Sequence, residues 1–122
     1  MTLTEYQLLR RKEMSEEELL ACIIKTAHLF GWLACHQRPM RTKDGEWRTG
    51  VQGDKGFPDI VLVNETKLLI IEAKSEIGKL ALEQEEWIRR LRLAHYKNGV
   101  LVLRPSDWFS GKIESILSGE GE

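Results

Sequence analysis

Two apolar stretches decide the fold of this chain: GFPDIVLV at residues 56–63 and LLIIEAK at residues 68–74. Each contains an aliphatic run of strand length, and the four polar residues between them have the length of a hairpin turn. Asp59 opens the first strand, whereas Glu72 and Lys74 close the second. Antiparallel pairing about the turn brings Asp59 level with Glu72 and Lys74. Because side chains alternate between the faces of a strand, Glu72 and Lys74 point one way and Ala73 points the other.

Three charged residues at the ends of two apolar strands need a partner of opposite charge or a bound cation, because transferring an ion out of water costs several kcal/mol or more in free energy. Carboxylates are ligands that Mg²⁺ prefers, and Mg²⁺ would activate a water and offset charge on a phosphate. Lys74 could then orient or deprotonate that water, or stabilise an oxyanion. Two simpler interpretations stay open at this point. Asp59 could be an ordinary turn acid after Pro58, and Glu72 with Lys74 could form a surface ion pair of little energetic value.

The remaining sequence predicts an α/β domain with a mixed central β-sheet flanked by helices, in the order α-β-β-β-α-β-α. The expected elements are a short helix or arm in 1–14, a helix from 15 to about 30, strands at 32–38, 60–63 and 68–73, a helix at 80–95, a strand at 99–103 and a last helix from 105. The glycine-bearing segment 40–56 is expected to be a long hairpin or loop with a short strand near 46–48. A chain of 122 residues can bury one core. We expect one domain over residues 1–122 with its core at about 15–117.

Helical phase adds two polar residues to the same region. Ser15 is a candidate N-cap with capping-box spacing to Glu18. At about 100° per residue, Glu16 lies in line with the apolar stripe of this first long helix. In the helix at 80–95, Gln84 shares its face with Trp87 and Ile88, whereas the neighbouring glutamates do not. Gln84 is therefore the polar residue of its helix that faces inward, whereas Glu16 is either a helix-end charge that reaches water or a site residue.

Composition excludes several classes of protein. The chain is 42% hydrophobic and 30% charged with a net charge of −1, as in an ordinary globular protein and unlike a strongly basic nucleic-acid binder. No apolar run approaches the ~20 residues of a membrane helix, and the first residues lack the pattern of a signal peptide. Cys22 and Cys35 have neither zinc nor disulfide spacing and are expected to be buried thiols. A cytoplasmic location follows from these features.

Two basic groups are candidates for contact with a phosphate backbone. The first precedes Asp59 and comprises Arg38, Arg41, Lys43, Arg48 and Lys55. The second comprises Arg89, Arg90, Arg92 and Lys97. Either group could equally be a solvated surface, since charged runs usually are.

Five elements in this order resemble the VRR-NUC domains of the PD-(D/E)xK nuclease superfamily, and within them the stand-alone phage-type proteins. The matching positions are Glu16, Gly56-Phe57-Pro58-Asp59, Glu72-Ala73-Lys74 and Gln84, with further similarity at 30–32 and 104–108. The resemblance extends from residue 15 to about residue 117. One position departs from the pattern, because Leu20 stands where related sequences often carry Gln.

The resemblance implies a restriction-endonuclease-like core and a DNA endonuclease dependent on Mg²⁺ or Mn²⁺. Asp59, Glu72 and the backbone carbonyl of Ala73 would bind the metal, and Glu16 would contribute to the metal site directly or through water. Lys74 would assist the attacking water, and Gln84 would support the lysine or that water. It further implies a homodimer acting on branched DNA or a Holliday junction, in the cytoplasm of a host cell for a phage-encoded member. The alternative is a non-catalytic DNA-binding or assembly module that kept the same scaffold.

Overall fold

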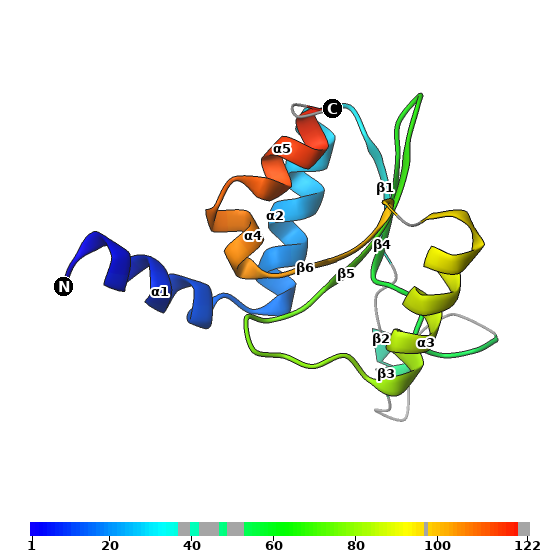
Figure 1. Cartoon of the computed structure of the whole chain (residues 1–122), viewed down its shortest axis with the longest axis horizontal. Helices are drawn as coiled ribbons and strands as arrows, with labels where there is room; N and C mark the ends of the chain where they lie inside the picture. Colours follow the sequence, from blue (N-terminus) through cyan, green and yellow to red (C-terminus); the bar gives the residue numbers. More distant parts are fainter. Residues whose placement is uncertain (37–39, 42–46, 49–52, 97, 120–122) are drawn as a thin grey trace.

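A four-stranded mixed sheet forms the centre of the molecule (Figure 1). The computed structural model describes residues 1–36, 40–41, 47–48, 53–96 and 98–119, without the side chains of 40, 41, 47, 48, 95 and 96. The strands of the sheet are β1 (Leu33–His36), β4 (Ile60–Val63), β5 (Leu68–Ala73) and β6 (Val100–Leu103). Their order is β1-β4-β5-β6, in which β4 pairs antiparallel with β1 and β5, while β6 runs parallel to β5. The predicted mixed sheet is therefore confirmed.

The hairpin of β4 and β5 determines which residues meet at the end of the sheet. Ile60 pairs with Ile71, so that the next positions outward are Asp59 and Glu72. Asn64 fixes the turn, because its side-chain oxygen accepts hydrogen bonds from the backbone N–H groups of Thr66 and Lys67 at 2.9 and 2.7 Å. Both strands begin and end where the sequence predicted.

Helices cover both faces of the sheet (Figure 1). They are α1 (Leu3–Glu13), α2 (Glu16–Leu29), α3 (Leu82–Leu91) with the π-helical turn η1 (Arg92–Tyr96), α4 (Pro105–Phe109) and α5 (Lys112–Ser118). The helices α2, α4 and α5 lie on one face and α3 lies on the other, while α1 extends away from the body. Within the part of the chain that the structure describes, no helix has the length and apolar character needed to cross a bilayer.

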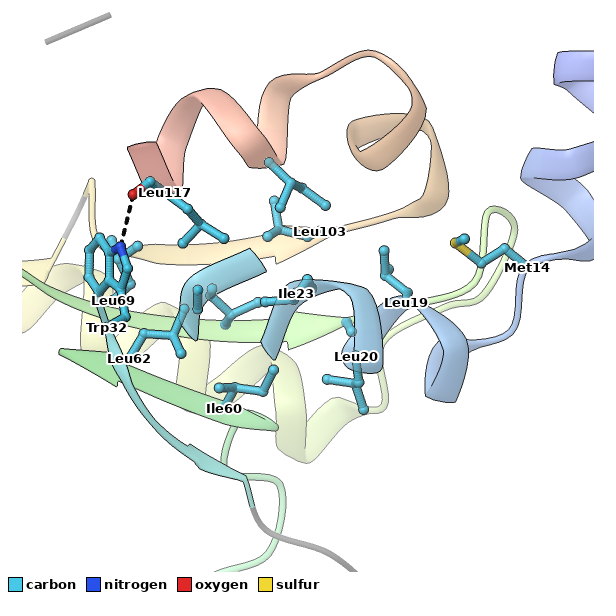
Figure 2. Close-up of a cluster of buried hydrophobic side chains, with 14 residues drawn as sticks. Met14, Leu19, Leu20, Ile23, Trp32, Ile60, Leu62, Leu69, Leu103 and Leu117 are labelled. Atoms are coloured by element: carbon cyan, nitrogen blue, oxygen red, sulfur yellow. Dashed lines mark hydrogen bonds between the residues drawn. The ribbon is translucent and has the colours of Figure 1, made fainter. Parts of the chain in front are cut away.

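The main core lies between the sheet and α2 (Figure 2). Ser15 caps α2 by accepting a hydrogen bond from the N–H of Glu18 at 3.1 Å, as predicted. The apolar stripe of α2 then buries Leu19 and Ile23 completely against the sheet. Trp32 closes the far end, where its indole N–H donates to the carbonyl of Leu117 at 2.8 Å. This packing fixes where α2 begins, and so where Glu16 lies.

Several predicted boundaries and one burial prediction were wrong. The single last helix is two helices, because Gly111 adopts φ = +85° between α4 and α5. The helix expected at 80–95 ends as α3 at residue 91 and continues as η1. The first strand covers 33–36, and residues 37 and 38 of the predicted strand lie outside the described residues. Cys35 is exposed and Cys22 is half-buried, because the strand that carries Cys35 is at the edge of the sheet.

The segment before Asp59 contains the two short strands β2 (Met40–Arg41) and β3 (Trp47–Arg48), which pair antiparallel. This pairing agrees with the predicted hairpin and its short strand. Arg38 and Lys43 lie outside the described residues, and only the backbone of Arg41 and Arg48 is described. Lys55 is exposed. The DNA contacts expected of this basic group stay a prediction.

Candidate active site

Asp59 and Glu72 meet on the face of the sheet that α3 covers. Glu72 is only 2% exposed, and Asp59 is half-buried at the start of β4. The Asp59 carboxylate accepts a hydrogen bond from the backbone N–H of Ala73 at 2.9 Å, which continues the pairing of the two strands through a side chain. The side chain of Ala73 packs into the core on the opposite face. The predicted alternation of these side chains is confirmed.

Gln84 holds Glu72 from the first turn of α3. Its side-chain nitrogen donates to Oε1 of Glu72 at 2.7 Å, and its side-chain oxygen accepts from the N–H of Ala81 at 2.8 Å. The second bond fixes the amide orientation, because an N–H group can bind only the oxygen end. The inward orientation predicted for Gln84 from helical phase is confirmed.

One carboxylate oxygen of Glu72 is left buried without a partner. Oε2 makes no hydrogen bond within the described residues. Burial raises the pKa of Glu72 to about 8; the neighbouring Asp59 carboxylate adds to this rise, as does Glu16, while Lys74 opposes it. A buried anion in this position needs a proton or a cation. The pair Asp59 and Glu72 therefore fits Mg²⁺ or Mn²⁺, because Mg²⁺ commonly uses one or two carboxylates and completes its shell with waters.

Lys74 forms an ion pair with Glu16, not with Glu72. The Lys74 Nζ lies 3.7 Å from Oε1 of Glu16, and the Lys74 side chain is only 12% exposed. Glu16 thus reaches Lys74 while its own side chain stays 44% exposed, and the simple surface pair of Glu72 with Lys74 is excluded. Among the residues with described placement, no group of three or more His, Cys, Asp or Glu residues could hold a metal ion. The ligand roles expected of Glu16 and of the Ala73 carbonyl stay predictions.

The backbone just before Asp59 packs closely against α3. Trp87 donates its indole N–H to the carbonyl of Lys55 at 2.9 Å, and its ring meets Phe57 edge to face at 5.0 Å. Gly56 has φ = +100°, and a Cβ at this position would lie 2.7 Å from the backbone of Glu83. Only glycine allows this approach. The entry into Asp59 is therefore fixed by α3 as well as by the sheet.

Replacing Gly56 with Ala should destabilise the fold by more than about 2 kcal/mol, because the new methyl group adds overlap to an unfavourable φ. Gly53→Ala is the matched control, since Gly53 has φ = +118° and no atom within 4 Å of the place that a Cβ would take. Thermal unfolding of both variants measures the difference. Equal losses of stability would show that the close contact with Glu83 does not matter.

The second basic group is largely engaged within the protein. Arg89 and Arg90 both donate to the carboxylate of Glu86 at 2.7 Å, and they lower the pKa of Glu86 to about 2. Arg92 donates to the carbonyl of Val100 at 3.1 and 3.0 Å. Lys97 lies outside the described residues. The DNA contact considered for this group stays a prediction.

A cavity of about 910 Å³ lies between residues 53–55 and α3. Lys55, Trp87 and Arg90 line it, but neither Asp59 nor Glu72 does. The cavity therefore does not include the acidic pair.

One residue of this region received no role from the sequence. Arg104 follows β6, and its guanidinium binds the turn after Lys74. A signal was available, because parallel neighbours such as β5 and β6 end at the same edge of a sheet. A charged residue directly after the strand at 99–103 belongs to that edge.

A mixed sheet that carries Pro58-Asp59 and Glu72-Ala73-Lys74 at the end of its central hairpin defines a nuclease of the PD-(D/E)xK superfamily. The sequence model of the VRR-NUC domain matches residues 6–103, so the chain belongs to the VRR-NUC domain family. This membership gives it a nuclease-type function in DNA processing. Among curated proteins and among solved structures, none matches the chain significantly.

Proposed function

We propose that this chain is an endonuclease dependent on Mg²⁺ or Mn²⁺ that hydrolyses DNA phosphodiester bonds with an activated water. The observation that carries the proposal is the buried Glu72, whose Oε2 has no partner among the described residues and whose neighbour is a second carboxylate, Asp59. With both carboxylates charged, such a pair is unfavourable unless a cation binds between them.

Each residue of the site has a separate role in this proposal. Asp59, Glu72 and the Ala73 carbonyl hold the cation, and Gln84 keeps Glu72 in place through its hydrogen bond. When bound, the cation supplies an activated water and positive charge beside the scissile phosphate. Lys74 orients the attacking water or stabilises charge on the phosphate oxygens. Glu16 holds the Lys74 ammonium by their ion pair and acts on the cation site through water.

A cleavage panel tests the proposal. Single-stranded, linear duplex, flap, nicked and four-way-junction DNA are each incubated with Mg²⁺, with Mn²⁺ and with EDTA, and Asp59→Ala serves as the inactive control. We expect products that require the metal and that disappear in the variant. Salt-sensitive DNA binding without any metal-dependent product would instead support a non-catalytic DNA-binding module.

We also propose that a homodimer acts on branched DNA, with residues 1–122 of each chain forming one nuclease domain. The support is geometric. One pair of carboxylates can cleave one DNA strand at a time, so symmetric cuts in two DNA strands need two copies of the chain about a two-fold axis. Light scattering at the concentration of the cleavage assay gives the oligomeric state. A monomer that nicks single sites on linear duplex would contradict this part of the proposal alone.

A further inference from the structure

We propose that Arg104 is a positioning residue of this site, which acts through the turn at residues 75–78 that follows Lys74. The inference rests on the proposed nuclease function, because it concerns the placement of Lys74 and Gln84. It assigns to Arg104 no contact with DNA or metal.

A single nitrogen of Arg104 binds the carbonyl side of this turn. Its Nη1 donates to the carbonyl oxygens of Ser75 and Gly78, both at 2.7 Å, and lies 3.4 Å from the carbonyl of Glu76. A guanidinium presents several N–H donors in a fixed planar arrangement, so it can bind more than one backbone carbonyl at once. Three backbone carbonyls that converge on one cation define the position of the turn closely.

Hydrogen bonds at the start of α4 fix the backbone of Arg104 and connect it to the turn. The backbone N–H of Arg104 donates to Asp107 at 2.8 Å, and Glu76 accepts from the N–H of Ser106 at 2.9 Å. The N–H of Lys74 donates to the carbonyl of Leu103 at 3.0 Å, which extends the pairing of β5 with β6 by one residue. The turn is therefore bound to the start of α4 from both directions.

The other side of the turn meets the ion pair of the site. A Cβ at Gly78 would lie 3.6 Å from Oε1 of Glu16, the same oxygen that pairs with Lys74. A turn displaced toward α2 would therefore come into contact with Glu16 and disturb its ion pair with Lys74. Beyond the turn the chain reaches Ala81, whose N–H fixes the amide of Gln84. One short segment thus connects the placement of Lys74 with that of Gln84.

The turn has little apolar packing of its own. Ile77 is 85% exposed, and the internal hydrogen bond from the N–H of Gly78 to the carbonyl of Ser75 is long at 3.3 Å. Polar contacts with Arg104 and with the start of α4 must therefore fix its position. Loss of the guanidinium should loosen the turn without opening the core, because neither Arg104 nor residues 75–78 belong to the buried cluster that forms it.

The test compares Arg104→Met with Arg92→Met in the full chain. Arg92 is the matched control, because its guanidinium also binds a backbone carbonyl, that of Val100 at the opposite end of β6. For Arg104→Met we expect kcat for DNA cleavage to fall by about 10- to 100-fold, with KM unchanged, since small displacements of catalytic groups have effects of this size. Arg104→Lys should recover part of kcat, because an ammonium can bind some of the same carbonyls. Because Arg92 belongs to the second basic group, the control for kcat is Arg10→Met, at an α1 arginine outside both groups whose guanidinium lies 3.7 Å from Glu13. Arg10→Met should keep the wild-type kcat.

A second readout does not depend on cleavage. The side-chain amide resonances of Gln84, assigned by Gln84→Ala, should shift and broaden in metal-free Arg104→Met but not in Arg92→Met. Wild-type resonances and wild-type kcat in Arg104→Met, with only a lower melting temperature, would overturn the inference. If Arg104→Met does not fold, Arg104→Lys decides by the same two measurements. If the wild-type chain cleaves no DNA, the proposed function fails, and the Gln84 resonances still show whether Arg104 positions the site.

Discussion

Replacing Glu72 with Gln is expected to reduce DNA cleavage by at least about 1000-fold while the protein stays folded. The substitution keeps the shape of the side chain but removes the charge that holds a cation against Asp59. A loss of about 4 kcal/mol of transition-state stabilisation corresponds to this factor. Asp59→Asn should have an effect of similar size, because the cation site needs both carboxylates.

Single-turnover cleavage of the best substrate from the panel gives the rates, and circular dichroism shows whether each variant is folded. Glu65→Gln is the matched control, because Glu65 is exposed in the turn between β4 and β5, at the opposite end of the hairpin from Glu72. Its cleavage rate should equal that of the wild type. Wild-type rates in both Glu72→Gln and Asp59→Asn would exclude this pair as the catalytic centre.

The metal-free protein is expected to lose stability as the pH rises from about 5 to about 8.5. The pKa of Glu72 is about 8 in the folded protein against an ordinary value of 4.5, with burial as the main cause. Between these two values the folded chain keeps a proton that the unfolded chain has released. The free energy of unfolding therefore falls with rising pH across this window and levels off above it. The loss is at most about 5 kcal/mol, since a tenfold change in proton affinity corresponds to about 1.4 kcal/mol.

Urea unfolding in EDTA at several pH values measures this dependence. Other groups titrate as well, so the informative quantity is the difference between the wild type and Glu72→Gln, which has no proton to lose at this position. Above pH 8, Mg²⁺ or Mn²⁺ should restore stability to the wild type and leave the variant unchanged. Parallel pH profiles for the two proteins would show that Glu72 is not held in the buried state described above.

Local periodicity was sufficient to locate much of the candidate site. The register of a short hairpin follows from its turn, so the turn at residues 64–67 is enough to place Asp59 opposite Glu72. Helical phase then identified Gln84, because adjacent residues of a helix point in directions about 100° apart around its axis, which separates Gln84 from the glutamates beside it. Both inferences depend on geometry that spans only a few residues.

Contacts between distant segments could not be found in this way. The choice of Glu16 as partner of Lys74 depends on how α2 crosses the end of the sheet, which no local pattern records. The division of the last helix depends on Gly111 adopting a positive φ, although glycine within a helical pattern is often tolerated. The exposure of Cys35 follows from the place of β1 at the edge, which is a property of strand order and not of β1 itself.

The contacts of α3 have a mechanical consequence for the two carboxylates. Gln84 and Trp87 lie about one turn apart on this helix, and they bind Glu72 on β5 and the carbonyl of Lys55 ahead of Asp59. The helix α3 therefore contacts both the segment that leads into Asp59 and the strand that carries Glu72. Moving residues 55–58 away from α3 would break the hydrogen bond between Trp87 and Lys55. Moving β5 away from α3 would break the hydrogen bond between Gln84 and Glu72. The spacing of the carboxylates is thereby kept by a rigid helix on one side and by the strand pairing on the other.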